Sequence, residues 1–114
     1  MSDCLFCKMV SGEIRPDVVF ESDQVLAFRD IRPQAQVHVL VIPKQHIATL
    51  DDFPDDNPTL AAALFDAVKR VARQEDIATA GYRTVINCRD DGGQEVYHLH
   101  IHLLGGRRLA WPPG

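Results

Sequence analysis

A run of alternating histidines and apolar residues near the end of the chain constrains its fold more than any other feature. On a β-strand, alternate side chains lie on the same face. We therefore expect a strand over 96–104 whose histidines project together, about 6.5–7 Å apart, while the residues between them project into a core. The histidines are His98, His100 and His102, flanked on their own face by Val96 and Leu104, and the residues facing the core are Tyr97, Leu99, Ile101 and Leu103.

Three imidazoles on one face need partners, because polar groups without hydrogen bonds cost free energy when they are buried. The run either carries no function or binds zinc, which alternating histidines on a strand can hold. A third interpretation is phosphate chemistry, in which one neutral imidazole attacks and its neighbours donate hydrogen bonds. We favour the third interpretation.

The rest of the chain alternates short β-like runs with two helical patterns. The predicted strands cover 18–20, 25–28, 37–42 and 82–87, and the first two form a hairpin. The predicted helical segments are a turn over 4–10 that ends at Gly12 and a long helix over 59–75 that follows the cap Asn57 and Pro58. Loops are expected at 51–58 and at Asp91-Gly92-Gly93. This order predicts one α+β domain, residues 1–114, with a mainly antiparallel sheet of about five strands.

Composition excludes several classes of partner. A formal net charge of −4 with scattered basic residues disfavours nucleic-acid binding, which requires a basic face. No stretch approaches the roughly 20 apolar residues that span a bilayer, and Met1-Ser2-Asp3-Cys4 lacks the basic region that begins a signal peptide. Three cysteines, an odd number, indicate no disulfide framework. We therefore expect a cytoplasmic protein that binds neither a membrane nor a nucleic acid.

Outside the histidine run, one further histidine lies on a predicted strand. His38 shares a strand face with Leu40 and Ile42, which is a mostly apolar setting. A lone histidine there is either a hydrogen-bonded core residue or, if the two strands are neighbours, a partner of the histidine run.

Several motifs along the chain, together with the histidine run, resemble the Hint branch of the histidine triad superfamily, nearly from end to end. The motifs are Phe6-Cys7-Lys8, Leu26-Ala27-Phe28-Arg29-Asp30-Ile31, Pro33-Gln34-Ala35, Val41-Ile42-Pro43-Lys44, Gly81-Tyr82-Arg83, Asp91-Gly92-Gly93-Gln94, the stretch 96–106 and Trp111-Pro112-Pro113-Gly114. The resemblance implies the HIT-like fold and the activity of a purine nucleoside phosphoramidase. Such enzymes hydrolyse the P–N bond between a nucleoside monophosphate, such as AMP or GMP, and an amine.

The resemblance also implies roles for individual residues. His100 is the implied nucleophile, which forms a nucleotidyl-histidine intermediate that water then hydrolyses. His102 is implied to contact the phosphate and assist the leaving group, while His98 and His38 support them. The implied substrate contacts are Asp30 for the ribose, Phe6, Ile14, Phe28 and Ile31 for the base, and Asn87 and Gly93 near the phosphate. Closely spaced histidines resist being charged together, so one can stay a neutral nucleophile while another donates.

Without the resemblance, Asp30 fits a turn equally well, and the four apolar base contacts fit a plain core. Glu95 departs from the animal members of the family, which carry serine at this position, whereas bacterial members often carry glutamate. We therefore expect a bacterial protein. The Glu95 carboxylate is either a solvated loop charge or a group near the phosphate loop that affects the choice of amine.

The N-terminal segment Cys4-Leu5-Phe6-Cys7 has CxxC spacing. No predicted strand leads into it, which argues against a thioredoxin-like redox motif. The two cysteines are either unrelated thiols or part of a structural zinc site. Some bacterial family members and the related galactose-1-phosphate uridylyltransferases resemble the second pattern, which implies Cys4, Cys7, His46 and His98 as tetrahedral ligands. Catalysis itself is expected to need no cofactor.

The resemblance further implies a symmetric homodimer whose two sheets join into one. A small sheet has exposed edges unless another chain covers them. Trp111 lies in the C-terminal tail, and a monomer offers little surface against which this large side chain could be buried. We expect this tail to reach the partner's active site and Trp111 to select the amine. Two alternatives stay open for the function: a dinucleoside polyphosphate hydrolase or nucleotidyl transferase, and a nucleotide-binding regulatory scaffold with incidental catalysis.

Overall fold

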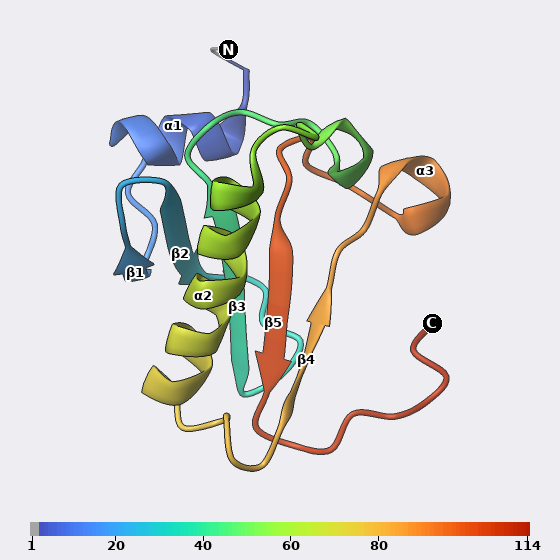
Figure 1. Cartoon of the computed structure of the whole chain (residues 1–114). Helices are drawn as coiled ribbons and strands as arrows, with labels where there is room; N and C mark the ends of the chain where they lie inside the picture. Colours follow the sequence, from blue (N-terminus) through green and yellow to red (C-terminus); the bar gives the residue numbers. More distant parts are fainter. Residues whose placement is uncertain (1–2) are drawn as a thin grey trace.

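The computed structural model describes residues 3–114, so Met1 and Ser2, where we looked for a signal peptide, lie outside the described residues. Its centre is a five-stranded sheet in the order β1-β2-β3-β5-β4, and all neighbouring strands are antiparallel (Figure 1). The strands are β1 (Val18–Glu21), β2 (Val25–Arg29), β3 (Val37–Pro43), β4 (Tyr82–Val85) and β5 (Ile101–Gly105). The predicted α+β fold class and the hairpin formed by β1 and β2 are confirmed.

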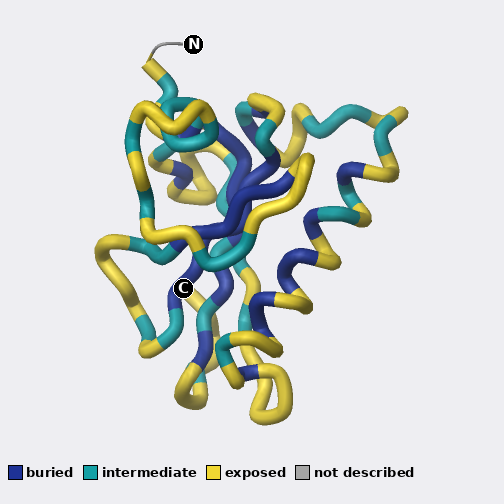
Figure 2. Tube along the Cα trace, turned by 90° about the vertical axis from the view of Figure 1, so that its left-hand side faces the viewer, coloured by how far each residue is buried: buried dark blue, intermediate teal, exposed yellow. Residues whose placement is uncertain are grey.

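The long helix α2 (Pro58–Gln74) covers one face of the sheet. It begins where expected because the Asn57 side chain accepts a hydrogen bond from the Leu60 backbone N–H at 3.1 Å. Its apolar stripe packs on Val25, Ala27, Val39, Val41, Ile101 and Leu103, all of which are buried. Figure 2 shows that buried residues are concentrated in the central strands and along one side of this helix. Burial of this stripe stabilises the helix on the sheet.

A second, smaller core lies on the opposite face of the sheet, beneath α1 (Leu5–Ser11). This helix starts at Cys4, whose Sγ accepts from the Cys7 N–H, and it ends at Gly12, where φ is 86°. Phe6 packs from α1 onto Leu26, Phe28, Leu40 and Ile42. On this face of the sheet, the area that α1 does not cover carries polar side chains of β3 and β5.

The histidine run is less regular than expected. Strand pairing begins only at Ile101, opposite Val41, so the predicted strand is wrong over 96–100. Pro43, at the end of β3, has no N–H with which to continue the ladder, and the Leu99 N–H donates to Ile47 O instead, at 2.6 Å. Leu99 still faces the core, but Tyr97 does not, since its side chain is 43% exposed.

Three other boundaries differ from the sequence predictions. The expected loop 51–58 begins with a 3-10 turn, Leu50–Asp52, and the expected turn at Asp91-Gly92-Gly93 is the end of a short helix, α3 (Arg89–Gly92). Gly93 closes α3 with a φ of 74°. Strand β4 ends at Val85, before Asn87, because the chain turns away into α3. Within residues 3–114, no helix is long and apolar enough to cross a membrane.

Candidate active site

His38 and His102 meet on the sheet face opposite α2. Strands β3 and β5 are neighbours, so the condition that we set for a partnership between these residues is met. The Nε2 atom of His38 lies 2.9 Å from Nδ1 of His102 and 3.4 Å from Oδ2 of Asp30. Asp30 follows β2 directly, and its backbone N–H donates to His38 O at 3.0 Å. Three neighbouring strands therefore bring one carboxylate and two imidazoles together.

The backbone of Gln34 decides where the protons of this group lie. Its N–H donates to Nδ1 of His38 at 3.0 Å, so a neutral His38 carries its proton on Nε2. That proton points at Nδ1 of His102, which must then carry its own proton on Nε2. Burial lowers the pKa of His38, and burial together with neighbouring His100 and His38 lowers the pKa of His102 to about 4. At neutral pH His102 is thus a neutral ring with one N–H to donate.

His100 has the opposite proton arrangement. Its Nδ1–H donates to the backbone carbonyl of His98 at 2.8 Å, which leaves a lone pair on Nε2. Its ring is nearly buried and meets the Phe6 ring edge-to-face, with centroids 5.3 Å apart at 89°. The His100 and His102 ring centroids are 5.0 Å apart, which is closer than the spacing expected for neighbouring positions on a regular strand face. A nucleophilic nitrogen and a hydrogen-bond donor therefore lie side by side.

His98 belongs to a different group of side chains. It is fully buried, and its Nε2–H donates to Pro43 O at 2.8 Å, which leaves the lone pair on Nδ1. This Nδ1 faces the Sγ atom of Cys4 at 3.3 Å, Sγ of Cys7 at 3.5 Å and Nδ1 of His46 at 3.3 Å. The structure therefore does not assemble the three histidines of the run into one metal site, because His98 and His102 lie in separate groups of potential ligands.

The group around His98 fits a metal ion. The four ligand atoms of Cys4, Cys7, His46 and His98 lie within 4.8 Å of one another, and two thiols with two imidazoles are a common set for structural zinc. Burial lowers the pKa of His98 and keeps it in the neutral form that binds metal. Burial and the adjacent Cys4 thiol raise the pKa of Cys7 to about 11. A metal ion would supply positive charge that favours the thiolate. No disulfide joins the cysteines.

Asp30, His38 and His102 also lie within 4.8 Å of one another, but their protons argue against a metal. The nitrogen that His38 presents to this group carries its proton, because Nδ1 already accepts the Gln34 N–H. A metal at Nε2 would require the other tautomer and would break that hydrogen bond. The two groups therefore have equally close ligand atoms but different chemistry. The group around His98 suits a metal ion, and the group around His38 is already joined by hydrogen bonds.

The expected nucleoside contacts lie at different depths. Phe6 and Phe28 are buried and pack edge-to-face at 5.4 Å, so they form part of the smaller core beneath this surface. Ile14 is half-buried and Ile31 is 92% exposed. Asp30 is also a turn residue, because its Oδ1 accepts the Arg32 N–H at 2.8 Å. Its second oxygen, Oδ2, is the one that lies near His38.

The expected phosphate contacts lie on the loop that contains α3. Gly92 packs against the backbone of Asn87, where an added Cβ would lie 3.5 Å from the Asn87 carbonyl carbon. This contact folds the loop tightly between Asn87 and Gly93. Glu95 is exposed and lies farther along, in a cavity of about 540 Å³ shared with Cys4 and His46. The Glu95 side chain is therefore on the side of the Cys/His group.

Trp111 is 79% exposed and lies beside β4, the last strand of the sheet. The guanidinium carbon of Arg83 is 5.8 Å from the Trp111 ring centroid, and an Arg83 N–H donates to Leu109 O at 3.3 Å. Figure 1 shows the tail running past the outer edge of β4. The interactions described for Trp111 within this chain are thus with Arg83 and not with the histidines.

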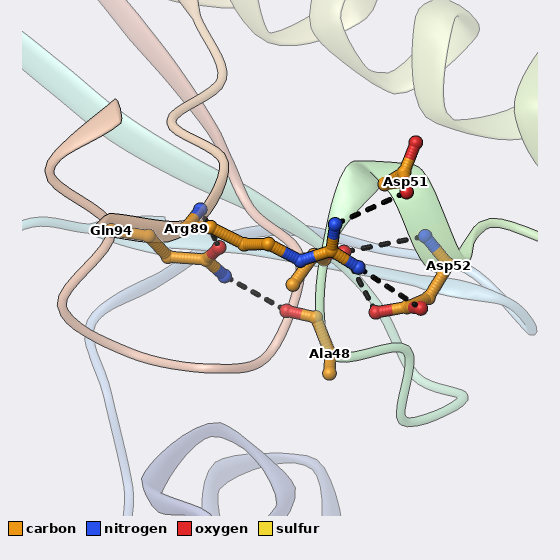
Figure 3. A network of polar contacts seen from close by, with 6 residues as sticks. Ala48, Asp51, Asp52, Arg89 and Gln94 are labelled. Carbon is orange, nitrogen blue, oxygen red and sulfur yellow. Dashed lines mark hydrogen bonds and ion pairs between the residues drawn. The ribbon is translucent and has the colours of Figure 1, made fainter. Parts of the chain in front are cut away.

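Sequence reasoning missed several contributors to this region. The Gln34 N–H and the His98 carbonyl are backbone groups, which no residue pattern distinguishes. Gln94 and Arg89 form a polar network with Ala48, Asp51 and Asp52 (Figure 3). Gln94 had one signal, its place at the end of the Asp91-Gly92-Gly93-Gln94 motif, and Arg83 had a similar one after Gly81-Tyr82.

Comparison with known proteins identifies the family of this chain. A HIT domain model matches residues 11–109. The purine nucleoside phosphoramidase of Escherichia coli K12 is 44% identical over 108 residues, which cover 95% of this chain and 91% of that protein. A HIT-like protein from Synechococcus elongatus is 57% identical over 112 residues, covering 98% and 97%.

Solved structures agree with the sequence comparisons. The crystal structure of a HIT family hydrolase from Legionella pneumophila Philadelphia 1 is 55% identical, with a TM-score of 0.95, and the match covers 98% of this chain and all of that one, at 100%. A histidine triad protein from Clostridium difficile is 42% identical with a TM-score of 0.93, covering 96% of each chain. This chain belongs to the HIT domain family, on its Hint-like branch.

Proposed function

We propose that this protein hydrolyses purine nucleoside phosphoramidates through a nucleotidyl intermediate on His100. The observation that carries the proposal is the opposite proton arrangement of two adjacent rings: His100 presents a lone pair at Nε2, and His102 presents an N–H at Nε2. Attack on phosphorus needs the first, and stabilisation of the phosphate oxygens needs the second. The 44% identical relative named purine nucleoside phosphoramidase supports this choice of substrate.

The first half of the proposed reaction transfers the nucleotide to the enzyme. Nε2 of His100 forms a bond to the α-phosphorus, the P–N bond breaks, and the amine departs with one added proton. The His38–His102 pair takes up that proton from solvent when the anionic phosphate binds and raises its proton affinity, and it then passes the proton to the departing amine. The Asp30 carboxylate, 3.4 Å from His38, favours the extra proton in the same way.

The second half regenerates the enzyme. Water attacks the phosphorus, returns a proton to the His38–His102 pair and displaces His100 as a neutral imidazole. The products are a nucleoside monophosphate and an amine. Asp30 accepts hydrogen bonds from the ribose, Ile14 and Ile31 contact the base above the layer of Phe6 and Phe28, and the loop with Asn87 and Gly93 contacts the phosphate.

Zinc has a structural part in this proposal. Cys4, Cys7, His46 and His98 would hold it, and it would link α1 to the histidine run. The link bears on chemistry only through position, because the His98 carbonyl and the Phe6 ring both contact His100. We further propose a cytoplasmic homodimer joined through the β4 edge, and three free cysteines fit a reducing compartment.

A fluorogenic adenosine phosphoramidate tests the proposed function. We expect steady turnover, release of AMP, and a trapped species whose intact mass is that of one chain plus one adenylyl group. A dinucleoside polyphosphate should be a much poorer substrate. Binding of AMP without turnover would instead identify a scaffold, and preference for the dinucleotide would identify the other hydrolase class.

A further inference from the structure

Gln94 is a buried residue that no part of the proposed mechanism uses. It is only 8% exposed, yet every hydrogen-bonding group of its amide side chain has a partner. Figure 3 shows the contacts with Arg89 and Ala48. Its Oε1 accepts the Arg89 N–H at 2.9 Å, and its NH₂ donates to Ala48 O at 2.8 Å and to Val96 O at 3.1 Å. One acceptor and two donors diverging from one short side chain require an amide.

The three partners of this amide belong to three different segments. Arg89 begins α3, the loop element between Asn87 and Gly93. Ala48 lies two residues after His46, and Val96 lies two residues before His98. Because the Leu99 N–H also donates to Ile47 O, the segment around Ala48 is fixed to the histidine run at two points. Gln94 therefore sets the position of α3 relative to the histidines.

Arg89 shows that this position is imposed from outside the loop. Its φ is +61°, a left-handed conformation that costs free energy for a residue with a side chain. A second hydrogen bond joins Gln94 to Arg89, because the Gln94 backbone N–H donates to Arg89 O at 3.1 Å. The Arg89 guanidinium reaches Asp51 at 3.2 Å and Asp52 at 3.6 Å, but these are exposed or half-exposed ion pairs, which contribute little.

We propose that the Gln94 side-chain amide is the positioning group of the phosphate loop, and that it sets how strongly the protein binds the phosphate of its nucleotide without affecting the nucleoside. The inference rests on the proposed function for the identity of the ligand. The amide acts through the backbone of residues 89–93, and Gln94 itself does not touch the substrate. The proposed nucleoside contacts, Asp30 and Ile31, follow β2, whereas this loop follows β4 at the opposite edge of the sheet, and none of the hydrogen bonds of the Gln94 side chain reaches them.

The test is Gln94→Glu, which keeps the shape of the side chain but replaces both donated hydrogen bonds with repulsion from two carbonyl oxygens. We expect the dissociation constant for AMP to rise on the order of 10-fold or more, while that for adenosine changes by less than about 2-fold. The value of kcat/KM for the phosphoramidate should fall on the order of 10²-fold, as for a displaced reacting group. The ratio of the AMP and adenosine affinities is the decisive readout, because general destabilisation would lower both.

Gln74→Glu is the matched control. Gln74 also donates its side-chain NH₂ to a backbone carbonyl, Val19 O at 2.8 Å, but on the far end of α2. The Gln74→Glu variant should leave the ratio of the AMP and adenosine affinities unchanged.

Equal losses of AMP and adenosine affinity in Gln94→Glu, or no loss of either, would overturn the proposal. If that variant does not fold, Gln94→Met replaces it, since it removes the same hydrogen bonds without adding charge. Failure of both to fold would show that the amide serves folding in general, and the specific role would be rejected. A wild-type protein that binds AMP without hydrolysing the phosphoramidate refutes the proposed function, yet the affinity ratio still decides the role of Gln94.

Discussion

The Nδ1 atom of His100 lies 2.8 Å from the main-chain carbonyl oxygen of His98. A carbonyl only accepts, so this contact holds the His100 proton on Nδ1 and exposes the lone pair on Nε2. The side chain of His98 faces in another direction, toward two thiols and a second imidazole. One residue thus connects the proposed nucleophile, through its backbone, to the proposed metal group, through its ring.

The nucleophile gives the first prediction. His100→Ala should abolish the nucleotidyl intermediate and lower turnover by on the order of 10³-fold or more, because no other described nitrogen here combines a free lone pair with this position. His102→Gln keeps a hydrogen-bond donor and the His100 nucleophile but cannot pass a proton to the amine, so it should slow formation of the intermediate without abolishing it and should cost less than His100→Ala. Intact-mass measurement after rapid quenching separates the two. Near-normal turnover by His100→Ala would refute the mechanism.

Burial of His102 predicts a pH-dependent stability. Its pKa falls from an ordinary 6.5 to about 4 in the folded protein, so between these values the unfolded chain binds more protons than the native one. The free energy of unfolding should therefore fall as the pH drops from 6.5 to 4, with up to about 3 kcal/mol from His102.

Urea unfolding at pH 7.5, 5.5 and 4.5 measures this dependence. The variant His102→Gln should show a shallower loss of stability toward acid than the wild type, although His38 and His98 have lowered pKa values and retain part of the slope. Identical slopes for the two proteins would contradict the assignment of a neutral, half-buried His102.

The Cys/His group predicts a metal content. Tag-free protein should contain about one zinc per chain, and Cys4→Ser with Cys7→Ser should remove it. A stability loss of only 2 kcal/mol would lower the melting temperature by about 8 °C in a chain of this size. Cys88→Ser is the matched control, since Cys88 is also a free thiol but lies outside the four-residue group. Zinc that persists in the double variant would rule the site out.

The fold could be predicted from the sequence because its signals are local. The Asn57-Pro58 pair begins α2, Gly12 ends α1, β-rich apolar runs mark β2 and β3, and apolar alternation marks β5. The failures are where tertiary contacts override a local pattern. Histidine alternation predicts a strand back to residue 96, but ladder pairing stops at Ile101, near the prolyl end of β3. Tyr97 therefore leaves the core face that alternation assigns to it.

The candidate site was predictable as a set of residues but not as an arrangement. Residue types indicate which side chains can attack, donate or bind metal, and the structure brings His38, His102 and Asp30 together as well as Cys4, Cys7, His46 and His98. Proton positions depend on two backbone groups, the Gln34 N–H and the His98 carbonyl, and every residue has such groups. The separation of the His98 and His102 side chains depends on another backbone group, because the His98 Nε2–H donates to Pro43 O.

The sheet edge and the tail predict the state of assembly. Within residues 3–114, strand β4 is paired only with β5, and Tyr82 and Thr84 along it are exposed, so a second copy can add its own β4 there. Sedimentation of dilute protein should show a two-chain species. A monomer at micromolar concentration would contradict the proposed dimer and, with it, any role of one tail in the partner's site.

The same edge positions the tail for a role in choosing the amine. Arg83 lies opposite Leu104, and Leu104 lies opposite His38, so the side chain that holds the tail projects on the same face as the catalytic group. Deleting Trp111 to Gly114 should therefore change the ranking of amine leaving groups and leave AMP affinity within about 2-fold. Arg83→Gln should shift the ranking in the same direction, because it releases Leu109 O and the Trp111 ring, whereas Arg70→Gln, which only breaks a surface pair with Asp66, should not. A truncation that loses AMP binding and keeps the amine ranking would place the tail at the nucleoside and not at the leaving group.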